Sequence, residues 1–381
     1  MSTINSTDPL IDDELDEFTS LPSVEQYELI KSSMMSDNEE DQHNALLRII
    51  DLSPLTQFGS ENEAVTFDST KEQLRSLLVN DELIIPFLIQ IINNLTINTQ
   101  NNSLTQMSTQ MEMRYDAVQA LSTLMMQEWH RQIIFEKQLL SISSSIVTDD
   151  NMVDQLLSNL CEMIKCSILV AQMNAAFALT FLVMNGSIAA HLCSNCDFRQ
   201  ALFDIFVLHR SQCESSRRLN ENQESFRVYS FIILYRMSFH SSLIDQMFFT
   251  PFQLDSSHLR IPSVPSQSLT TFQFLFYLLL SIPSYTCRLM ILGSIQQILQ
   301  LASDTRFQCI KETPQFPSQI ETIVVFQREC QMRLQTRATG NRQSKSSQST
   351  SIQLPAGATD KNVELLKLSD AILQLLNGSN V

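Results

Sequence analysis

The sequence predicts an all-α protein built from stacked helices. The pattern Ala-x-x-Ala-Leu-x-x-Leu occurs twice, beginning at Ala117 and at Ala175. Its spacing of i, i+3, i+4 and i+7 places four apolar side chains along one stripe of an α-helix. Alanine in half of that stripe lets a neighbouring helix approach closely. The chain has only 6 glycines in 381 residues, which favours helices and disfavours Gly-rich phosphate loops.

The N-terminal part carries nearly all of the net charge of −16, because 19 acidic but only 4 basic residues occur up to Glu82. We expect residues 1–22 to be an acidic disordered tail, since acidic residues surround Leu15 and Phe18. A solubilising role is favoured over a short partner motif. The acidity argues against a broad nucleic-acid footprint in this part of the chain.

Four helices are predicted before the first copy of the pattern. The second has acidic residues in its first turn, where the helix dipole favours them. Ser69 and Glu72 form a Ser-x-x-Glu capping box that starts the third helix. Pro86 precedes or begins the fourth. A loop rich in Asn, Thr, Ser and Gln follows. The predicted helices are 24–35, 38–52, 69–78 and 87–95, and the loop is 96–110.

The repeat helices come next, and their stripe recurs in weaker form further along. Asn185-Gly186 is expected to end the second strong copy. Successive copies lie about 53 to 63 residues apart, longer than an armadillo or HEAT unit of about 40 to 47, and loops account for the difference. Residues 23–330 are therefore predicted to form an armadillo- or HEAT-like right-handed α-solenoid with loop insertions. The helices concerned are 114–129, 152–164, 172–184, 225–239 and 287–302, and the main insertions are 212–224 and 252–268.

The chain changes character after residue 330. Residues 331–358 are predicted to be a basic, Ser/Gln-rich linker, more typical of a solvated tether than of an RNA-binding segment. Residues 359–377 are predicted to be an amphipathic helix with Leu365, Leu368, Ile372 and Leu375 on one face. Because so short a stripe is too little for a free coiled coil, the helix should dock onto the solenoid end or onto another protein.

The sequence offers no catalytic constellation, and we expect neither an enzyme nor a cofactor. Cys193, Cys196, His209 and Cys213 have a spacing that zinc ligands can adopt. The segment between them reads better as an apolar core helix, so buried thiols are favoured over a metal site. The residues after Met1 do not have the charged-then-apolar pattern of a signal peptide, and the longest apolar stretch, 269–282, is too short to span a bilayer. We therefore expect the eight cysteines to be free thiols and the protein to be cytoplasmic or nuclear.

A resemblance to one armadillo family runs through residues 24–310. It is carried by Gln26-Tyr-Glu-Leu-Ile, Asn44-Ala-Leu-Leu-Arg, Phe87-Leu-Ile-Gln-Ile-Ile, Arg114-Tyr-Asp-Ala-Val-Gln-Ala-Leu-Ser-Thr-Leu and Arg288-Leu-Met. In this order the segments resemble the Rcd-one / Caf-forty family, the ninth subunit of the CCR–NOT mRNA deadenylase complex. The family's Pro-rich stretch is replaced here by the loop 96–110, and its Phe-Glu-Tyr-Leu-Arg segment has no match near 170–174. The resemblance implies a non-enzymatic adaptor in mRNA decay and translational repression. Such an adaptor packs against the NOT scaffold subunit and presents peptide-binding surfaces to mRNA-recruiting factors.

Independently of any family, a row of stacked helices offers an extended groove to a protein partner. Positions outside the apolar stripe would line it, and polar amides there could bond to a partner's extended backbone. Ordinary solvation explains the same residues equally well. The alternatives are a generic armadillo scaffold and an RNA-binding α-solenoid that uses Arg114, Arg131 and the basic linker. The predicted partner-binding residues are Arg114, Gln119, Ser122, Asn174 and Thr180.

Overall fold

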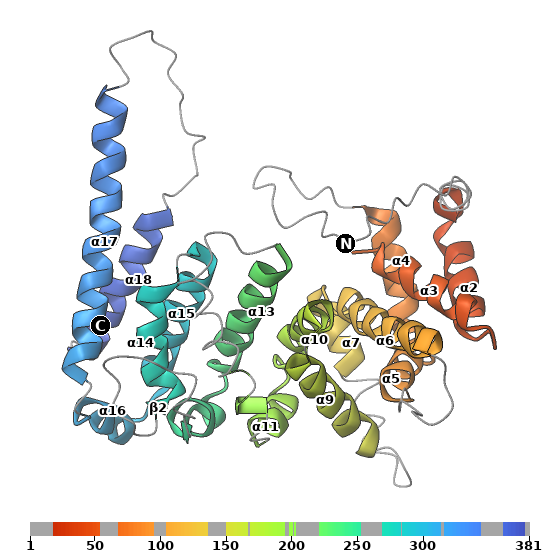
Figure 1. Ribbon diagram of the computed structural model, residues 1–381, viewed down its shortest axis with the longest axis horizontal. Coiled ribbons are helices and arrows are strands. Elements are labelled where there is room, and N and C mark those ends of the chain that lie inside the picture. The colour runs from red at the N-terminus through yellow and green to blue at the C-terminus, as the bar shows by residue number, and fades with distance from the viewer. Residues whose placement is uncertain are drawn as a thin grey trace. The chain divides into compact units, whose positions relative to one another are not determined.

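The computed structural model is an all-α solenoid whose helices form two compact units, Met1–Phe181 and Leu182–Val381 (Figure 1). One antiparallel pair of two-residue strands interrupts the described helices. No single helix among them is both long and apolar enough to cross a membrane. Helices α4 and α5 pass such a test only together, and a bend of 75° separates them. The structure describes residues 18–53, 68–94, 104–135, 150–166, 168–194, 198–200, 202, 221–252, 269–282, 284–313, 316–343 and 361–377.

The first unit consists of helices that pack against one another. Helix α6 packs against both α3 and α5, and α5 in turn packs against α9. Helices α3 and α6 run parallel, because His43 meets Asp116 and Ser53 meets Met126, each pair 73 residues apart. The helices are α2 (Ser23–Met34), α3 (Glu39–Ile50), α4 (Ser69–Asn80), α5 (Ile84–Asn94), α6 (Leu104–Leu124), α7 (Glu128–Ile133), α9 (Asp150–Lys165) and α10 (Leu169–Leu182).

The apolar stripe is core, as its spacing predicts. All eight side chains of the two copies are buried, with none more than 1% exposed. In α10 the stripe is Ala175, Ala178, Leu179 and Leu182. Because alanine has almost no side chain, these positions bring helix backbones together and leave little space for polar groups. The predicted role of the pattern in helix packing is confirmed.

Three local predictions in the first unit are wrong. Asp68, not Ser69, caps α4, since its carboxylate accepts hydrogen bonds from the backbone N–H groups of Thr70 and Lys71. The predicted loop 96–110 is helical from Leu104 onward, and its earlier part lies outside the described residues. The expected tail extends too far, because Phe18 is buried beneath the guanidinium group of Arg48, 4.5 Å from the ring centroid.

Asn185-Gly186 begins a helix instead of only ending one. The Asn185 side-chain oxygen accepts hydrogen bonds from the backbone N–H groups of Ser187 and Ile188, which is the geometry of an N-cap. Gly186 is then the first residue of α11 (Gly186–Ser194). Asn185-Gly186 does lie at a helix boundary, and the hydrogen bonds show that Asn185 caps the helix that follows it, α11.

The second unit contains the strand pair and most of the remaining helices. In the strand pair, Pro251 lies opposite Thr270 and Phe252 opposite Leu269. Thr270 and Gln273 form a capping box at the start of α14, the apolar core helix that the sequence predicts. After α11 its elements are α13 (Glu221–Met237), the 3₁₀-helix η2 (Ser241–Leu243), the π-helix η3 (Asp245–Phe249), β1 (Pro251–Phe252), β2 (Leu269–Thr270), α14 (Thr271–Ser281), α15 (Tyr285–Leu301), α16 (Asp304–Lys311), α17 (Phe316–Gln343) and α18 (Lys361–Leu376).

Helices α13 and α15 approach closely through a glycine. A Cβ atom added at Gly293 would lie 2.7 Å from the Tyr235 ring, too close for an unshifted side chain. On α15, the apolar residues Ile291, Ile295 and Ile298 of the weaker stripe copy are buried. The same packing rule therefore holds in both units, with glycine in place of alanine.

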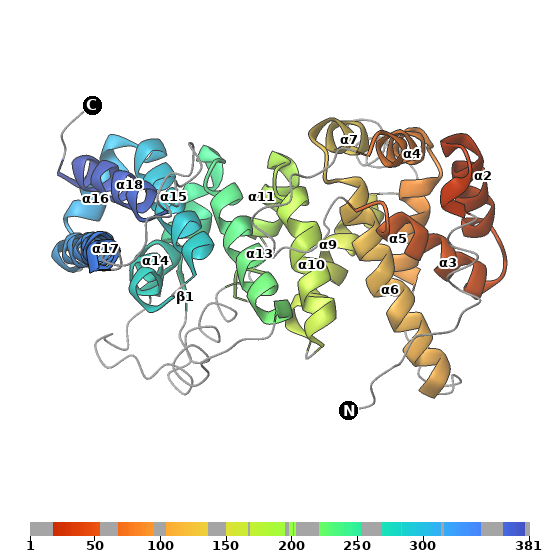
Figure 2. The ribbon, with the colours of Figure 1, turned by 90° about the horizontal axis from the view of Figure 1, so that it is seen from above.

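The C-terminal helix is the last layer of the second unit. Helix α18 packs against α15 and α17, and it lies beside them in both ribbon views (Figures 1 and 2). Leu365, Ile372 and Leu376 are buried there, and Gln327 donates a hydrogen bond to Asp370 at 2.6 Å. The docking predicted for this helix is confirmed, onto the helices of its own chain. The predicted linker is wrong over 331–343, which continue α17, and residues 344–358 lie outside the described part.

Truncating the apolar face of α18 should destabilise the second unit. We expect Ile372→Ala to lower the free energy of unfolding by about 2–5 kcal/mol, because a fully buried isoleucine leaves a cavity. Gln374→Ala, at an exposed position of the same helix, is the control and should change it little. Chemical denaturation of both variants measures the difference. Equal stability of the two variants would mean that α18 is not part of the core.

Candidate functional site

Three of the five predicted partner-binding residues are buried and cannot line an exposed groove. Ser122, Asn174 and Thr180 are no more than 3% exposed. The Ser122 hydroxyl donates to the Val118 carbonyl at 2.7 Å, and the Thr180 hydroxyl donates to the Phe177 carbonyl at the same distance. Small hydroxyl side chains can satisfy themselves on the preceding helical turn, so their polarity did not require exposure. The prediction that they face a partner is corrected.

Asn174 joins two helices of the first unit. Its Nδ2 donates to the Tyr115 carbonyl at 3.2 Å and to the Gln119 side-chain oxygen at 3.4 Å, which fixes α10 beside α6. Gln119 is half-buried. Asn174 thus positions Gln119, and Gln119 remains a candidate for contact with a partner.

Arg114 and Arg131, the two arginines of the RNA-binding alternative, make different contacts within the fold. Arg114 is half-buried, and desolvation lowers its pKa while the nearby Glu162 carboxylate opposes that effect. Arg131 donates to the carbonyls of Met125 and Met126 at the end of α6 and lies 5.6 Å from the Phe181 ring centroid. Because the Arg131 guanidinium group already completes the C-terminal end of α6, it is poorly placed to bind phosphate.

Three helices of the first unit present a continuous mixed surface, which we call the α3–α6–α10 face. His43 and Asp116 link α3 to α6 at 2.8 Å and remain 24% and 19% exposed. Residues three or four positions along each helix share its face. The face consists of His43 and Leu47 on α3, Asp116 and Gln119 on α6, and Val170 and Phe177 on α10.

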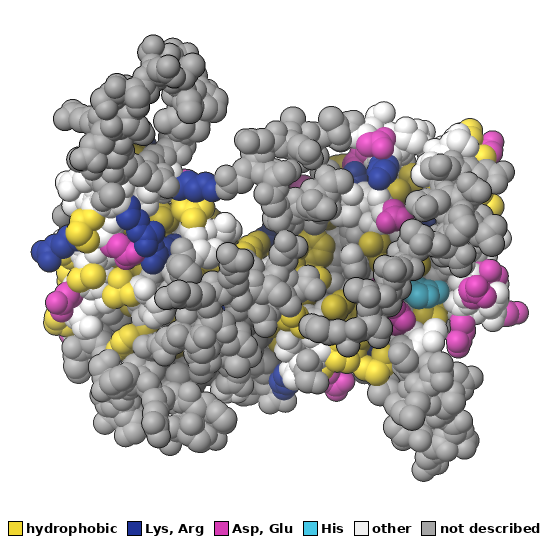
Figure 3. All heavy atoms as spheres, turned by 45° about the horizontal axis from the view of Figure 1, so that its top comes forward, with side chains coloured by type: hydrophobic (Ala, Val, Ile, Leu, Met, Phe, Trp, Pro, Cys, Tyr) yellow, Lys and Arg dark blue, Asp and Glu magenta, His cyan; other side chains and the backbone are white. Residues whose placement is uncertain are grey.

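Two apolar members of this face, Leu47 and Val170, are exposed to solvent. Leu47 is 43% exposed and Val170 is 45% exposed, and half-buried Phe177 packs edge-on against Phe181. Figure 3 shows acidic, histidine and hydrophobic side chains close together on the visible surface of the first unit. Carboxylate and amide groups can bond to a peptide backbone, and the apolar side chains can contact its side chains.

The proposed zinc ligands are described in part only. Cys193 is buried in α11, and desolvation raises the pKa of its thiol to about 12. A thiol that resists ionisation is a weak metal ligand, because metals bind the thiolate. Cys196, His209 and Cys213 lie outside the described residues. Within the part of the chain that the structure describes, no three potential ligands gather around one point.

The sequence did not predict a buried polar cluster that the structure shows in the first unit. His130 on α7 is 0% exposed, and its Nε2 lies 3.8 Å from Glu72, which also pairs with Arg75 on the same helix, α4. Neither ring nitrogen of His130 has a hydrogen-bond partner among the described residues. Burial lowers the pKa of His130 to about 4, although Glu72 acts in the opposite direction. Contact between α4 and α7 could not be read from the spacing of these residues.

Comparisons with known proteins add little to this picture. No family model matches the chain, and no curated protein matches it. Among solved structures, an engineered protein of the Northeast Structural Genomics Consortium aligns over 93% of this chain and 97% of its own, with 10% identity and a TM-score of 0.46. A designed armadillo repeat protein aligns over 92% of this chain and 99% of its own, with 12% identity and a TM-score of 0.44. TM-scores this low do not establish a shared fold. The all-α solenoid assignment therefore rests on the helix packing described above.

The His130 cluster should make the first unit sensitive to mild acid. The folded-state pKa of about 4 lies below the ordinary value of 6.5, so only the unfolded chain takes up this proton between those values. We expect the free energy of unfolding to fall as the pH drops from about 6.5 toward 4, by about 1–2 kcal/mol at pH 5.

The variant His130→Phe removes the titrating group and keeps an aromatic ring in the core. Its unfolding free energy, measured by urea denaturation at pH 7 and pH 5, should change less than that of the parent chain. An identical pH dependence in the two proteins would show that His130 is not buried in its neutral form.

Proposed function

We propose that the chain is a non-enzymatic adaptor that binds an extended segment of a partner protein across the α3–α6–α10 face. The observation that carries this proposal is the row of linked polar side chains, His43 with Asp116 and Gln119 with Asn174, beside the exposed Leu47 and Val170. Exposed apolar side chains next to organised polar groups are typical of interaction sites.

The spacing of packed helices suits an extended ligand. Neighbouring helices lie roughly 8–10 Å apart, and an extended chain advances about 3.3 Å per residue. A segment crossing from α3 to α6, which pack directly, would therefore meet the second helix after about three residues. The polar groups of the face can bond to its backbone, while Leu47, Val170 and Phe177 contact its apolar side chains.

The charge of the first unit indicates the chemistry of the partner. Glu112 is exposed one turn before Asp116 on α6, and acidic residues outnumber basic ones 19 to 4 up to Glu82. A partner segment that carries Lys or Arg among apolar residues would complement this field. Association should accordingly weaken as salt concentration rises.

We further propose mRNA deadenylation as the biological setting, in the cytoplasm, the nucleus or both. The support is the resemblance to the Rcd-one / Caf-forty family, whose matching segments at Asn44 and Arg114 fall on α3 and α6. The expected partners are the NOT scaffold subunit of the CCR–NOT complex and proteins that recruit target mRNAs. A generic scaffold role is the alternative outcome.

Affinity purification of the full chain from its own cells tests both proposals. We expect the NOT scaffold subunit among the co-purifying proteins. The double variant Leu47→Ser/Val170→Ser should reduce its recovery about tenfold, because each side chain loses apolar contact area worth on the order of 1 kcal/mol.

The matched control is Leu29→Ser/Leu83→Ser, which changes two exposed leucines of the first unit that lie off this face. Recovery of other partners with the same dependence on Leu47 and Val170 would keep the adaptor and overturn the deadenylase setting. Equal recovery with both double variants would overturn the binding face itself.

A further inference from the structure

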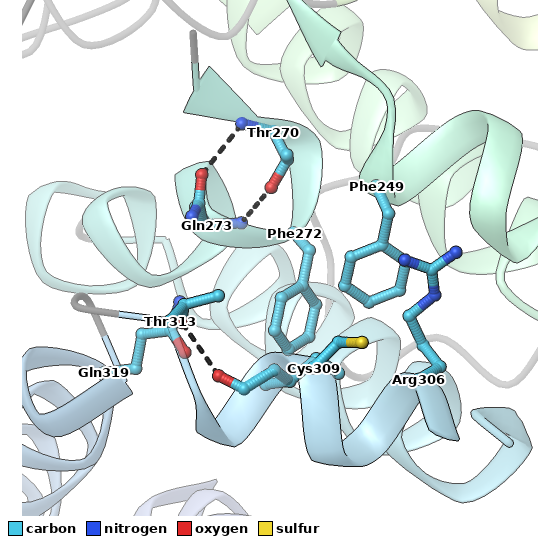
Figure 4. A pocket seen from close by; sticks show the side chains of 9 residues that line it. Phe249, Thr270, Phe272, Gln273, Arg306, Cys309, Thr313 and Gln319 are labelled. Carbon is cyan, nitrogen blue, oxygen red and sulfur yellow. Dashed lines mark hydrogen bonds between the residues drawn. The ribbon is translucent and has the colours of Figure 1, made fainter. Parts of the chain in front are cut away.

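The second unit contains a cavity that is separate from the α3–α6–α10 face. Its volume is about 170 Å³, and it lies where the π-helix η3, strand β2 and helices α14, α16 and α17 meet (Figure 4). A π-helix is rare and often accompanies a functional site. Here it contributes Phe249 to the wall and Asp245 to the rim.

The walls of this cavity suit an aromatic ring. The Phe249 and Phe272 rings pack against each other in a tilted arrangement with centroids 5.1 Å apart, and buried Ile310 forms another part of the wall. An apolar cavity of about 150 Å³ is large enough to hold benzene. At about 170 Å³, this one has room for a single six-membered ring with one small substituent.

One polar group of the lining is unsatisfied. Gln319 lines the cavity and is only 4% exposed, and its side-chain oxygen has no hydrogen-bond partner among the described residues. Leaving a buried carbonyl oxygen without a donor costs free energy, and a ligand that brings a donor recovers it. The polarity of the cavity therefore selects a ring that carries an N–H or O–H group.

The rim leaves the cavity accessible from solvent. Arg306 pairs with Asp245 at 2.6 Å and lies over the Phe249 ring, 5.0 Å from its centroid, which holds one side of the entrance. Cys309, on the same helix as Arg306 (α16), also lines the cavity and is exposed. Because the entrance opens at the surface, a side chain can enter while the backbone that carries it stays outside.

We propose that this cavity binds a phenolic ring, supplied by a tyrosine side chain of a partner protein. The ring packs against the Phe249–Phe272 pair inside the cavity. Its hydroxyl group donates to the Gln319 oxygen and can accept from the Gln319 amide, which a phenylalanine ring cannot do. The site does not depend on the partner proposed for the first unit.

Protection of Cys309 from alkylation tests the proposal with the full chain. The probes are p-cresol and toluene, which have the same ring and methyl group but differ in the hydroxyl. We expect p-cresol to slow iodoacetamide labelling of Cys309, read by peptide mass spectrometry, at a concentration at least about threefold lower than toluene requires. Cys166 in the first unit is the internal reference and should label at an unchanged rate.

Two variants assign the selectivity to its residue. Gln319→Leu should abolish the preference for p-cresol and leave toluene protection intact or stronger. Gln308→Leu, at an exposed position on α16, should keep the preference. Equal protection by the two probes in the parent chain, or no protection by p-cresol, would overturn the proposal.

Short blocked peptides identify the source of the ring. Acetyl-Gly-Tyr-Gly-amide should protect Cys309 at lower concentration than the phenylalanine counterpart. If p-cresol protects Cys309 and the tyrosine peptide does not, the ligand is a free phenol and the assignment to a partner's tyrosine is wrong.

Discussion

Close approach of helix backbones is the constraint on which the rest of the structure depends. In the first unit α6, whose Ala117 and Ala120 are buried, packs against α3 and α5, and Asn174 of α10 reaches the Tyr115 carbonyl of α6. In the second unit Gly293 performs the same role against Tyr235. Dispersion and apolar burial stabilise such contacts only while the interface is tight, because protein interiors are close-packed.

This packing determines which polar side chains lie near the surface, where they could contact a partner. When the stripe is buried, residues next to it in the chain lie at the edge of the interface, and some bond across it. His43 with Asp116 and Gln119 with Asn174 are such pairs. They cost little to keep ordered because neighbouring helices already hold them, so a partner would meet a preorganised surface. Exposed Leu47 and Val170 then add apolar area that the fold itself does not use.

The all-α fold, the buried stripe and the docking of the C-terminal helix could be predicted because each depends on spacing within one helix. The spacing of residues within one helix does not show which other segment packs against that helix. Ser122 and Thr180 were assigned to a surface because they are polar, whereas their hydroxyls bond to their own helix. The Glu72–His130 contact and the cavity around Gln319 join segments far apart in sequence, and no periodicity announces them. The run 331–343 reads as linker by composition, yet it continues α17.

The stability of Ala178→Leu tests the packing account most directly. Ala178 is fully buried on α10, one turn after Asn174. If the small side chain is needed for the helices to pack here, leucine cannot fit, and the free energy of unfolding should fall by about 1–3 kcal/mol. Val170→Leu, at an exposed position of α10, should leave it nearly unchanged. An Ala178→Leu protein as stable as the parent chain, or more stable, would contradict the claim that close helix approach organises this protein.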